Sequence, residues 1–164
     1  MNIRVGIMTL KINDNIPNFK VIDDEGNSFT QENLKNQLTV LYFYPKNDTP
    51  GCTNEAIDFN SLINEFISYG ANVFGVSKDS IDSHKKFKEK YDLEFTLLSD
   101  PTLDMHKAFG AYGTKTSFGK TSEGVIRSTF IIGKNLNILY LDPKVSVKGH
   151  AEIILDKIKY LSNS

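Results

Sequence analysis

Apolar and polar residues alternate along this chain in blocks of strand and helix length. The run Thr39–Tyr44 is almost continuously apolar, as expected of a central strand that is covered on both faces. Asn72–Ser77 and Phe95–Leu98 are further short apolar runs, and they predict two more central strands. These three segments are separated by stretches of helical periodicity, a pattern typical of an α/β protein.

Shorter extended segments predict two hairpins. Val21–Phe29 alternates around the acidic, glycine-containing turn Asp23–Asn27, and such a turn between extended pieces indicates a hairpin. Gly124–Ile132 and Leu136–Leu141 flank a Gly-Lys-Asn turn and predict the second one. The central sheet is therefore expected to be mixed rather than purely parallel.

Apolar residues at helical spacing predict the helices that cover the sheet. One helix is expected to end at Gly70, a residue type that favours helix C-termini, and its apolar face comprises Ala56, Phe59, Leu62, Ile63, Phe66 and Ile67. A second helix follows the cap Asp79-Ser80, and a short third one runs from Asp100-Pro101 to Phe109. A last helix spans about His150–Leu161, which gives a mixed sheet with helices on both faces.

Composition narrows the class of protein. The 164 residues fit a single domain, with 40% apolar and 24% charged residues. The net charge of −1 gives no basic surface for nucleic acid or an anionic membrane. No segment has the composition of a signal peptide or the apolar length of a membrane span. We therefore expect a cytoplasmic protein that does not bind nucleic acid or membranes.

Cys52 is the one cysteine of the sequence, and it lies where the 39–44 strand should lead into a helix. Helix N-termini stabilise the thiolate form, which is the nucleophile. Pro50 suits the start of a helix and Gly51 permits close approach of the backbone. The alternative is a buried cysteine with a purely structural role, since free cysteine is among the most buried residue types.

The residues before Cys52 carry a family resemblance. Pro45-x-x-x-Thr49-x-x-Cys52 is similar to the active-site motif of the peroxiredoxins. The resemblance extends in order from about Leu10 to the end of the chain, and it is closest to the bacterioferritin-comigratory-protein (peroxiredoxin Q) subfamily. The segments that carry it are Leu41–Ala56, Gly75–Asp79, Leu98–Pro101, Gly124–Phe130 and Val147–Glu152.

The resemblance implies a thioredoxin-like fold and a role for each site residue. Cys52 would be the peroxidatic cysteine, Pro45 would shield its sulfur, Thr49 would hydrogen-bond the sulfur and the bound peroxide, and Arg127 would lie beside both. Fixed donors of this kind stabilise the negative charge that develops on the departing oxygen. Glu55 would pair with Arg127; it could equally serve the dipole of the helix, and the two roles are compatible.

The chain departs from its subfamily at the position of the second cysteine. Many members carry a resolving cysteine five residues after the first, whereas this chain has Ile57 there and no other cysteine. An intramolecular disulfide cycle is therefore excluded, and an external thiol such as thioredoxin, glutaredoxin or glutathione must reduce the sulfenic acid. Residues 1–8 are interpreted as an N-terminal extension of the single domain.

These observations predict a thiol peroxidase that reduces hydrogen peroxide and organic hydroperoxides without metal, haem or flavin. We expect a monomer, and a dimer is the alternative. The alternative is a redox-responsive binding or holdase protein in which oxidation of Cys52 is a signal. A thiol–disulfide oxidoreductase of the same fold is disfavoured because the sequence has no Cys-x-x-Cys.

Other candidate residues receive structural interpretations. His84, His106 and His150 have no metal-ligand spacing, so they are interpreted as helix-face or capping residues. Gly110–Gly124 is interpreted as a long loop, and the family resemblance implies that it lies near the active site. Within it, Phe118 could line a peroxide channel or simply pack in the loop.

Overall fold

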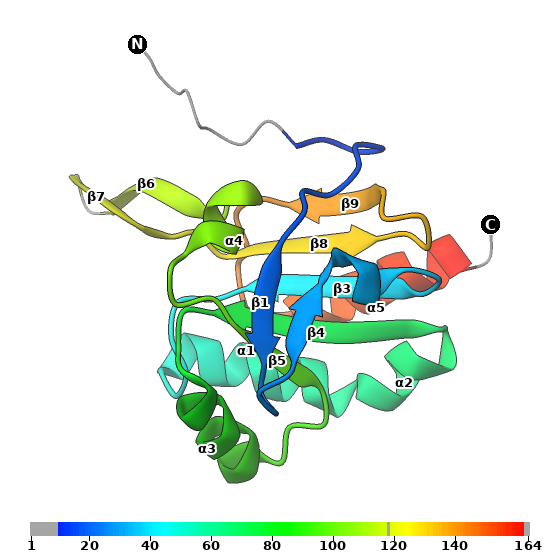
Figure 1. Cartoon of the computed structure of the whole chain (residues 1–164), viewed down its shortest axis with the longest axis horizontal. Coiled ribbons are helices and arrows are strands. Elements are labelled where there is room, and N and C mark those ends of the chain that lie inside the picture. Colours follow the sequence, from blue (N-terminus) through cyan, green and yellow to red (C-terminus); the bar gives the residue numbers. More distant parts are fainter. Residues whose placement is uncertain (1–9, 118, 163–164) are drawn as a thin grey trace.

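A mixed β-sheet runs through the centre of the molecule in the computed structural model, which describes residues 10–117 and 119–162 (Figure 1). The sheet has seven strands in the order β2-β1-β5-β4-β3-β8-β9. Strands β3, β4 and β5 are parallel to one another, whereas β1, β2, β8 and β9 pair antiparallel with their neighbours. The strand bounds are β1 Lys20–Asp23, β2 Ser28–Thr30, β3 Leu38–Phe43, β4 Ala71–Ser77, β5 Thr96–Ser99, β8 Ser128–Ile132 and β9 Ile138–Asp142.

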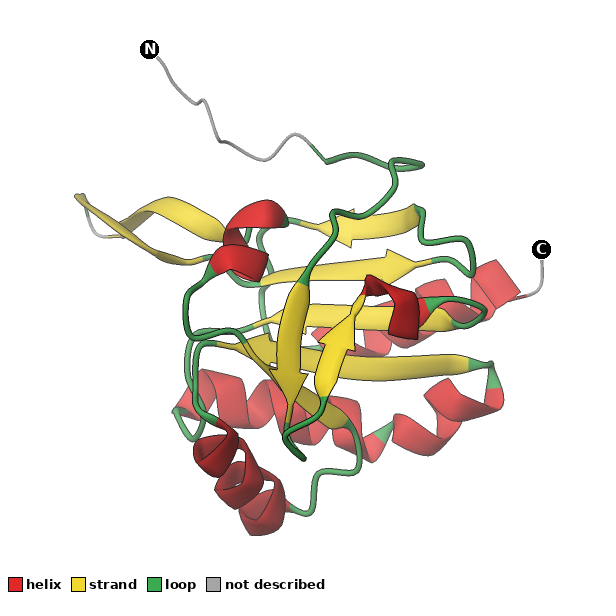
Figure 2. Ribbon diagram, in the orientation of Figure 1, coloured by secondary structure: helices red, strands yellow, loops and turns green. Residues whose placement is uncertain are grey.

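Helices cover both faces of this sheet (Figure 2). Helices α1, α2, α3 and α5 contribute to the apolar cluster on one face, and α4 and the 3₁₀ helix η1 contribute to the cluster on the other. The bounds are η1 Gln31–Leu34, α1 Pro50–Ser61, α2 Ile63–Ser68, α3 Ile81–Tyr91, α4 Asp104–Ala108 and α5 His150–Ser162. The α/β class and the mixed sheet expected from the sequence are confirmed.

Strand β3 shows why its sequence is continuously apolar. Val40 and Tyr42 point into the cluster beneath α1 and α5, and the alternate residues Leu41 and Phe43 point into the cluster on the opposite face. Because successive side chains of a strand face opposite ways, a strand with two covered faces needs no polar alternation. All six residues of β3 are buried.

Two of the expected helices differ from the structure. The expected helix ending at Gly70 is interrupted at Leu62, which has φ −107° and ψ 6° and separates α1 from α2. Just before it, the Ser61 hydroxyl donates to the Asp58 carbonyl oxygen, a local bond that competes with the helical ladder. Asp100-Pro101 forms a turn, and α4 begins only at Asp104, after a left-handed Leu103.

The interpretation of Gly110–Gly124 as a loop is wrong. Strands β6 (Tyr112–Ser117) and β7 (Lys120–Val125) form a separate two-stranded antiparallel sheet. The first four residues of β7 are exposed, so the hairpin lacks the alternation of apolar residues that reveals a half-buried strand. The expected 124–132 strand is also divided, because β7 ends at Val125 and β8 starts at Ser128. Phe118 and the proposed extension 1–8 lie outside the described residues.

Across the described ranges, no helix combines the length and the apolar character needed to cross a membrane.

Candidate active site

Cys52 lies in the first turn of α1, as the sequence predicted. Thr49 is the N-cap with extended backbone angles, and Pro50 is the first helical residue. The cysteine is a free thiol and only 1% exposed. At this position it faces the unpaired N–H groups and the positive end of the helix dipole, both of which stabilise a negative charge on sulfur.

Arg127 reaches the sulfur from the neighbouring strand. Its Nη2 donates to Sγ of Cys52 at 3.1 Å, and its Nη1 donates to Oε1 of Glu55 at 2.8 Å. The residue directly precedes β8, whose Ser128 pairs with Phe43 at the end of β3. Because the 45–49 loop leaves β3 at the same end, the sheet register brings Arg127 and Cys52 together. The guanidinium therefore contacts both the sulfur of Cys52 and a carboxyl group.

Gly51 leaves room for the guanidinium. A Cβ atom at this position would lie 2.9 Å from Nη2 of Arg127, which is closer than a nonbonded carbon and nitrogen can approach. The close approach expected for Gly51 is therefore present, and its partner is the arginine side chain.

Glu55 is a buried carboxyl group, and of its two oxygens Oε1 accepts a hydrogen bond from Arg127. It is 1% exposed, and among the described residues Oε2 has no hydrogen-bond partner. Burial raises the pKa of Glu55 to about 7, although the Arg127 guanidinium lowers it. Loss of hydration disfavours the charged form and a neighbouring cation favours it, and here the first effect is larger. Glu55 therefore changes its charge near neutral pH.

Thr49 and Pro45 lie in the segment between β3 and Cys52. The Thr49 hydroxyl donates to the carbonyl oxygen of Lys46 at 2.9 Å rather than to Cys52. Since its hydrogen is used in this way, the Thr49 oxygen is oriented to accept a hydrogen bond from a peroxide O–H. Pro45 and Arg127 both line a groove next to the site.

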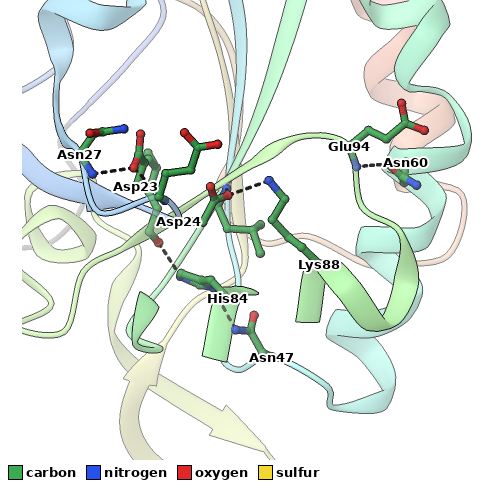
Figure 3. Close-up of polar contacts among 11 residues, drawn as sticks. Asp23, Asp24, Asn27, Asn47, Asn60, His84, Lys88 and Glu94 are labelled. Atoms are coloured by element: carbon green, nitrogen blue, oxygen red, sulfur yellow. Dashed lines mark hydrogen bonds and ion pairs between the residues drawn. The ribbon is translucent and has the colours of Figure 1, made fainter. Parts of the chain in front are cut away.

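The loop that carries these residues is held by Asn47, which the sequence analysis did not single out (Figure 3). Its side chain accepts from Tyr44 Oη at 2.6 Å and lies 2.9 Å from Nδ1 of His84. The same amide group donates to Ser83 Oγ, and the Asn47 backbone N–H donates to Asp79 at 2.8 Å. These bonds join the 45–49 loop to α3 and to the end of β4.

A second contact joins the same loop to α3 at the surface. Asp48 has φ +59°, and its carboxylate accepts from Lys90 Nζ and Tyr91 Oη, both at 2.7 Å. Nothing in the local sequence indicates either contact, since the partners lie more than thirty residues further along the chain.

The three histidines lie on helices and are all buried. His84 is held between Asn47 and the Leu98 carbonyl oxygen, His106 pairs with Asp100 at 2.7 Å, and His150 hydrogen-bonds Thr129 at 2.8 Å. Within residues 10–117 and 119–162, no group of three His, Cys, Asp or Glu side chains is arranged to hold a metal ion.

Comparison with known proteins identifies the class. The model of the AhpC/TSA family matches residues 12–141, and the chain belongs to this family. It is 41% identical over 148 residues to a putative peroxiredoxin bcp of Coxiella burnetii, covering 90% of this chain and 98% of that protein. Peroxiredoxin Bcp of Bacillus subtilis is 40% identical over 155 residues, covering 94% and 99%.

Solved structures agree with this assignment. PrxQ of Xylella fastidiosa superposes with a TM-score of 0.87 at 37% identity, over 93% of this chain and 98% of that one. The bacterioferritin comigratory protein of Xanthomonas campestris, described by its alkyl peroxide reduction activity, gives a TM-score of 0.84 at 34% identity, over 94% and 99%. The chain is therefore a peroxiredoxin of the Bcp (peroxiredoxin Q) type with a thioredoxin-like fold and a single cysteine.

Proposed function

We propose that Cys52 is the residue with which this thiol-dependent peroxidase reduces hydrogen peroxide and organic hydroperoxides. The observation that carries the proposal is the 3.1 Å hydrogen bond from Arg127 to a buried sulfur in the first turn of a helix. A buried cysteine with a purely structural role needs no guanidinium at its sulfur. The alkyl peroxide reduction activity of the Xanthomonas relative supports the organic part of the substrate range.

The first step forms one bond and breaks one. The Cys52 thiolate attacks the nearer peroxide oxygen, the S–O bond forms and the O–O bond breaks. The departing oxygen leaves with the electron pair and takes up a proton to give water or an alcohol. Arg127 and the N–H groups at the start of α1 stabilise the charge on that oxygen, and the Thr49 oxygen accepts a hydrogen bond from the peroxide O–H. Each fixed donor of this kind contributes about 3 kcal/mol to stabilising the transition state.

Pro45 and Glu55 support this arrangement. Pro45 lines the approach together with Arg127 and limits the access of water to the sulfur. Glu55 holds the guanidinium through its Oε1. The product of the first step is a sulfenic acid at Cys52, and an external thiol must reduce it because the sequence has no second cysteine.

We further propose a cytoplasmic protein that acts as a monomer, with a single domain. Recycling by an external thiol requires a reducing compartment, in which such thiols are abundant. Thioredoxin, glutaredoxin and glutathione are the candidate donors.

Stopped-flow measurement of the reduced protein with hydrogen peroxide tests the function. We expect a rate several orders of magnitude above that of a free thiol, no reaction for Cys52→Ser, and a loss of about a hundredfold for Arg127→Gln. Thr49→Ser should retain most of the rate and Thr49→Val should lose it, because only serine keeps the accepting oxygen. A free-thiol rate for the wild-type protein, or oxidation without turnover when thiol is supplied, would instead favour the redox-responsive binding protein.

A further inference from the structure

A groove beside the active site is much larger than hydrogen peroxide requires. Its volume is about 670 Å³, and Pro45 and Arg127 connect it to the site described above. A water molecule occupies about 30 Å³ of liquid volume, so hydrogen peroxide, with two oxygens, needs only about a tenth of this space. The groove can therefore hold a molecule with ten or more further heavy atoms.

The charged residues of this groove all have the same sign. Lys115 comes from β6 and Lys144 from the segment after β9, and Arg127 is the lining residue that donates a hydrogen bond to Cys52. Among the described lining residues there is no carboxylate; the uncharged ones are Pro45, Thr114, Thr116, Val125, Ile126, Pro143 and Val145. A cationic groove with a partly apolar lining favours an organic anion.

Three residues that line the groove belong to a strand with a free edge. Thr114, Lys115 and Thr116 of β6 are exposed, and among the described strands β6 pairs only with β7, in the two-stranded sheet. In the part of the chain that the structure describes, the backbone groups of residues 113–116 make no hydrogen bonds beyond this hairpin. Such an edge offers N–H and C=O groups to an extended, peptide-like molecule.

From these features we infer that the groove binds the reducing thiol, and that this thiol is a small peptide-like molecule carrying carboxylates. The inference rests on the proposed function and specifies which thiol reduces the sulfenic acid at Cys52. The carboxylates would pair with Lys115 and Lys144, the peptide groups would lie along β6, and the sulfur would reach Cys52 past Arg127.

The chemistry of this step balances with two molecules of the thiol. The first attacks the sulfur of the Cys52 sulfenic acid, so that an S–S bond forms, the S–O bond breaks and water leaves. The second attacks the sulfur of the small molecule in this mixed disulfide. Cys52 is released as a thiolate, and the two small thiols leave as their disulfide.

Single-turnover reduction of the sulfenic acid tests this inference. The protein is oxidised with one equivalent of hydrogen peroxide and mixed with glutathione or with glutathione diethyl ester, which lacks the two free carboxylates. With rates expressed per thiolate, we expect glutathione to react about tenfold faster at low salt. The difference should almost disappear in 1 M salt, where the Debye length is about 3 Å. Intact-mass analysis should show the mixed disulfide at Cys52.

Variants of Lys115 and Lys144 test whether these two residues cause the preference for glutathione over its ester. Lys115→Gln combined with Lys144→Gln should remove the preference for glutathione, and the corresponding double change to Arg should retain it. Lys134→Gln is the matched control, because Lys134 follows the other end of β8 and lines a different pocket. It should leave the preference unchanged. Equal rates for glutathione and its ester in the wild-type protein would overturn the inference.

A second measurement tests whether the groove binds the reducing thiol or the hydroperoxide substrate. Oxidation of Cys52 is measured with a carboxylate-bearing hydroperoxide and with its methyl ester. If the preference for a carboxylate appears in this step and not in the reduction, the groove binds the hydroperoxide and the inference is wrong. A failure of the wild-type protein to form the sulfenic acid rapidly would instead contradict the proposed function itself.

Discussion

Arg127 donates one hydrogen bond to the sulfur of Cys52 and another to a carboxyl oxygen of Glu55, so a single guanidinium links the thiol to a titratable group. Gly51 determines where this guanidinium can lie, because its missing Cβ would occupy the space next to Nη2. Glu55 determines how much of the positive charge is neutralised. At the scale of single residues, the site therefore depends on two contacts of Arg127. Its contact with Cys52 requires glycine at position 51, and its contact with Glu55 depends on pH.

Gly51→Ala should separate activity from stability. The added methyl group would displace the guanidinium, and we expect the rate with hydrogen peroxide to fall by about ten- to a hundredfold. Stability should not fall, since alanine is favoured over glycine in helices by about 1 kcal/mol. Stopped-flow kinetics and urea unfolding measure the two effects.

Gly113→Ala is the matched control for this change. A Cβ at Gly113 would come no closer than 3.6 Å to Ile126, so the rate should be unaffected. A Gly51→Ala variant with the wild-type rate would show that the position of Arg127 does not limit the reaction.

Glu55 should make the stability of the protein depend on pH. Its pKa is about 7 in the folded protein against an ordinary value of 4.5, so the folded state holds this proton more tightly than the unfolded state. The free energy of unfolding should therefore be highest below about pH 4.5 and fall as the pH rises to 7, by roughly 3 kcal/mol from this group. Above pH 7 its contribution should be constant.

The Glu55→Gln variant tests this pH dependence of the unfolding free energy. Glutamine resembles the protonated carboxyl group and does not titrate, so the variant should gain stability relative to wild type between pH 4.5 and 7. The charged groups that act on Glu55, Arg127 and Asp58, are the same in both proteins. A difference in unfolding free energy that does not vary with pH would contradict the raised pKa.

At the scale of elements, the loop between β3 and α1 is held by α3. Asn47 satisfies a buried network with Tyr44, Ser83 and His84, and Asp48 makes an exposed pair with Lys90. Helix α3 lies beside this loop in Figure 1. Its role is to fix the backbone that carries Pro45 and Thr49.

Asn47→Ala should therefore reduce both stability and activity. The change removes the side-chain partner of buried polar groups on Tyr44 and His84, which costs about 2–3 kcal/mol. The loop is then held by the backbone bond to Asp79 and by the exposed contacts of Asp48. Urea unfolding and the rate with hydrogen peroxide measure the two effects.

Asp48→Asn serves as the comparison. It keeps a residue type that tolerates positive φ and removes only an exposed ion pair, which contributes little to stability. It should be close to wild type in both measurements. If the two variants behave alike, the buried network does not determine the position of the loop.

At the scale of the whole molecule, the chain has no internal way to protect its oxidised cysteine. Ile57 occupies the position at which many relatives carry a resolving cysteine, and no other cysteine exists in the sequence. Excess hydrogen peroxide without a thiol should therefore convert Cys52 to the sulfinic acid, with a mass gain of about 32 Da and irreversible loss of activity. Intact-mass spectrometry follows this conversion.

Added thiol should prevent the conversion by reducing the sulfenic acid first. A protein that stays at the sulfenic acid through many equivalents of peroxide, without any thiol, would contradict the need for an external reductant.

Much of the fold could be predicted because its signals are local. The apolar run of β3 follows from burial on both faces, and the cap Ser80 accepts from the Ser83 N–H at the start of α3 as expected. The β6–β7 hairpin could not be predicted, because its exposed residues have no need to alternate. The break at Leu62 also left no trace in the apolar periodicity, which continues across it.

The sequence by itself determined the central strands, most of the helices and the place of Cys52 at the start of a helix, because propensity, periodicity and capping act between near neighbours. Only the tertiary structure decided which groups meet at the sulfur. Arg127 lies 75 residues from Cys52 and reaches it because β8 pairs with β3 in one register. Asn47 meets His84, and Lys115 and Lys144 line one groove. Such contacts depend on strand order and packing, which local sequence patterns do not specify.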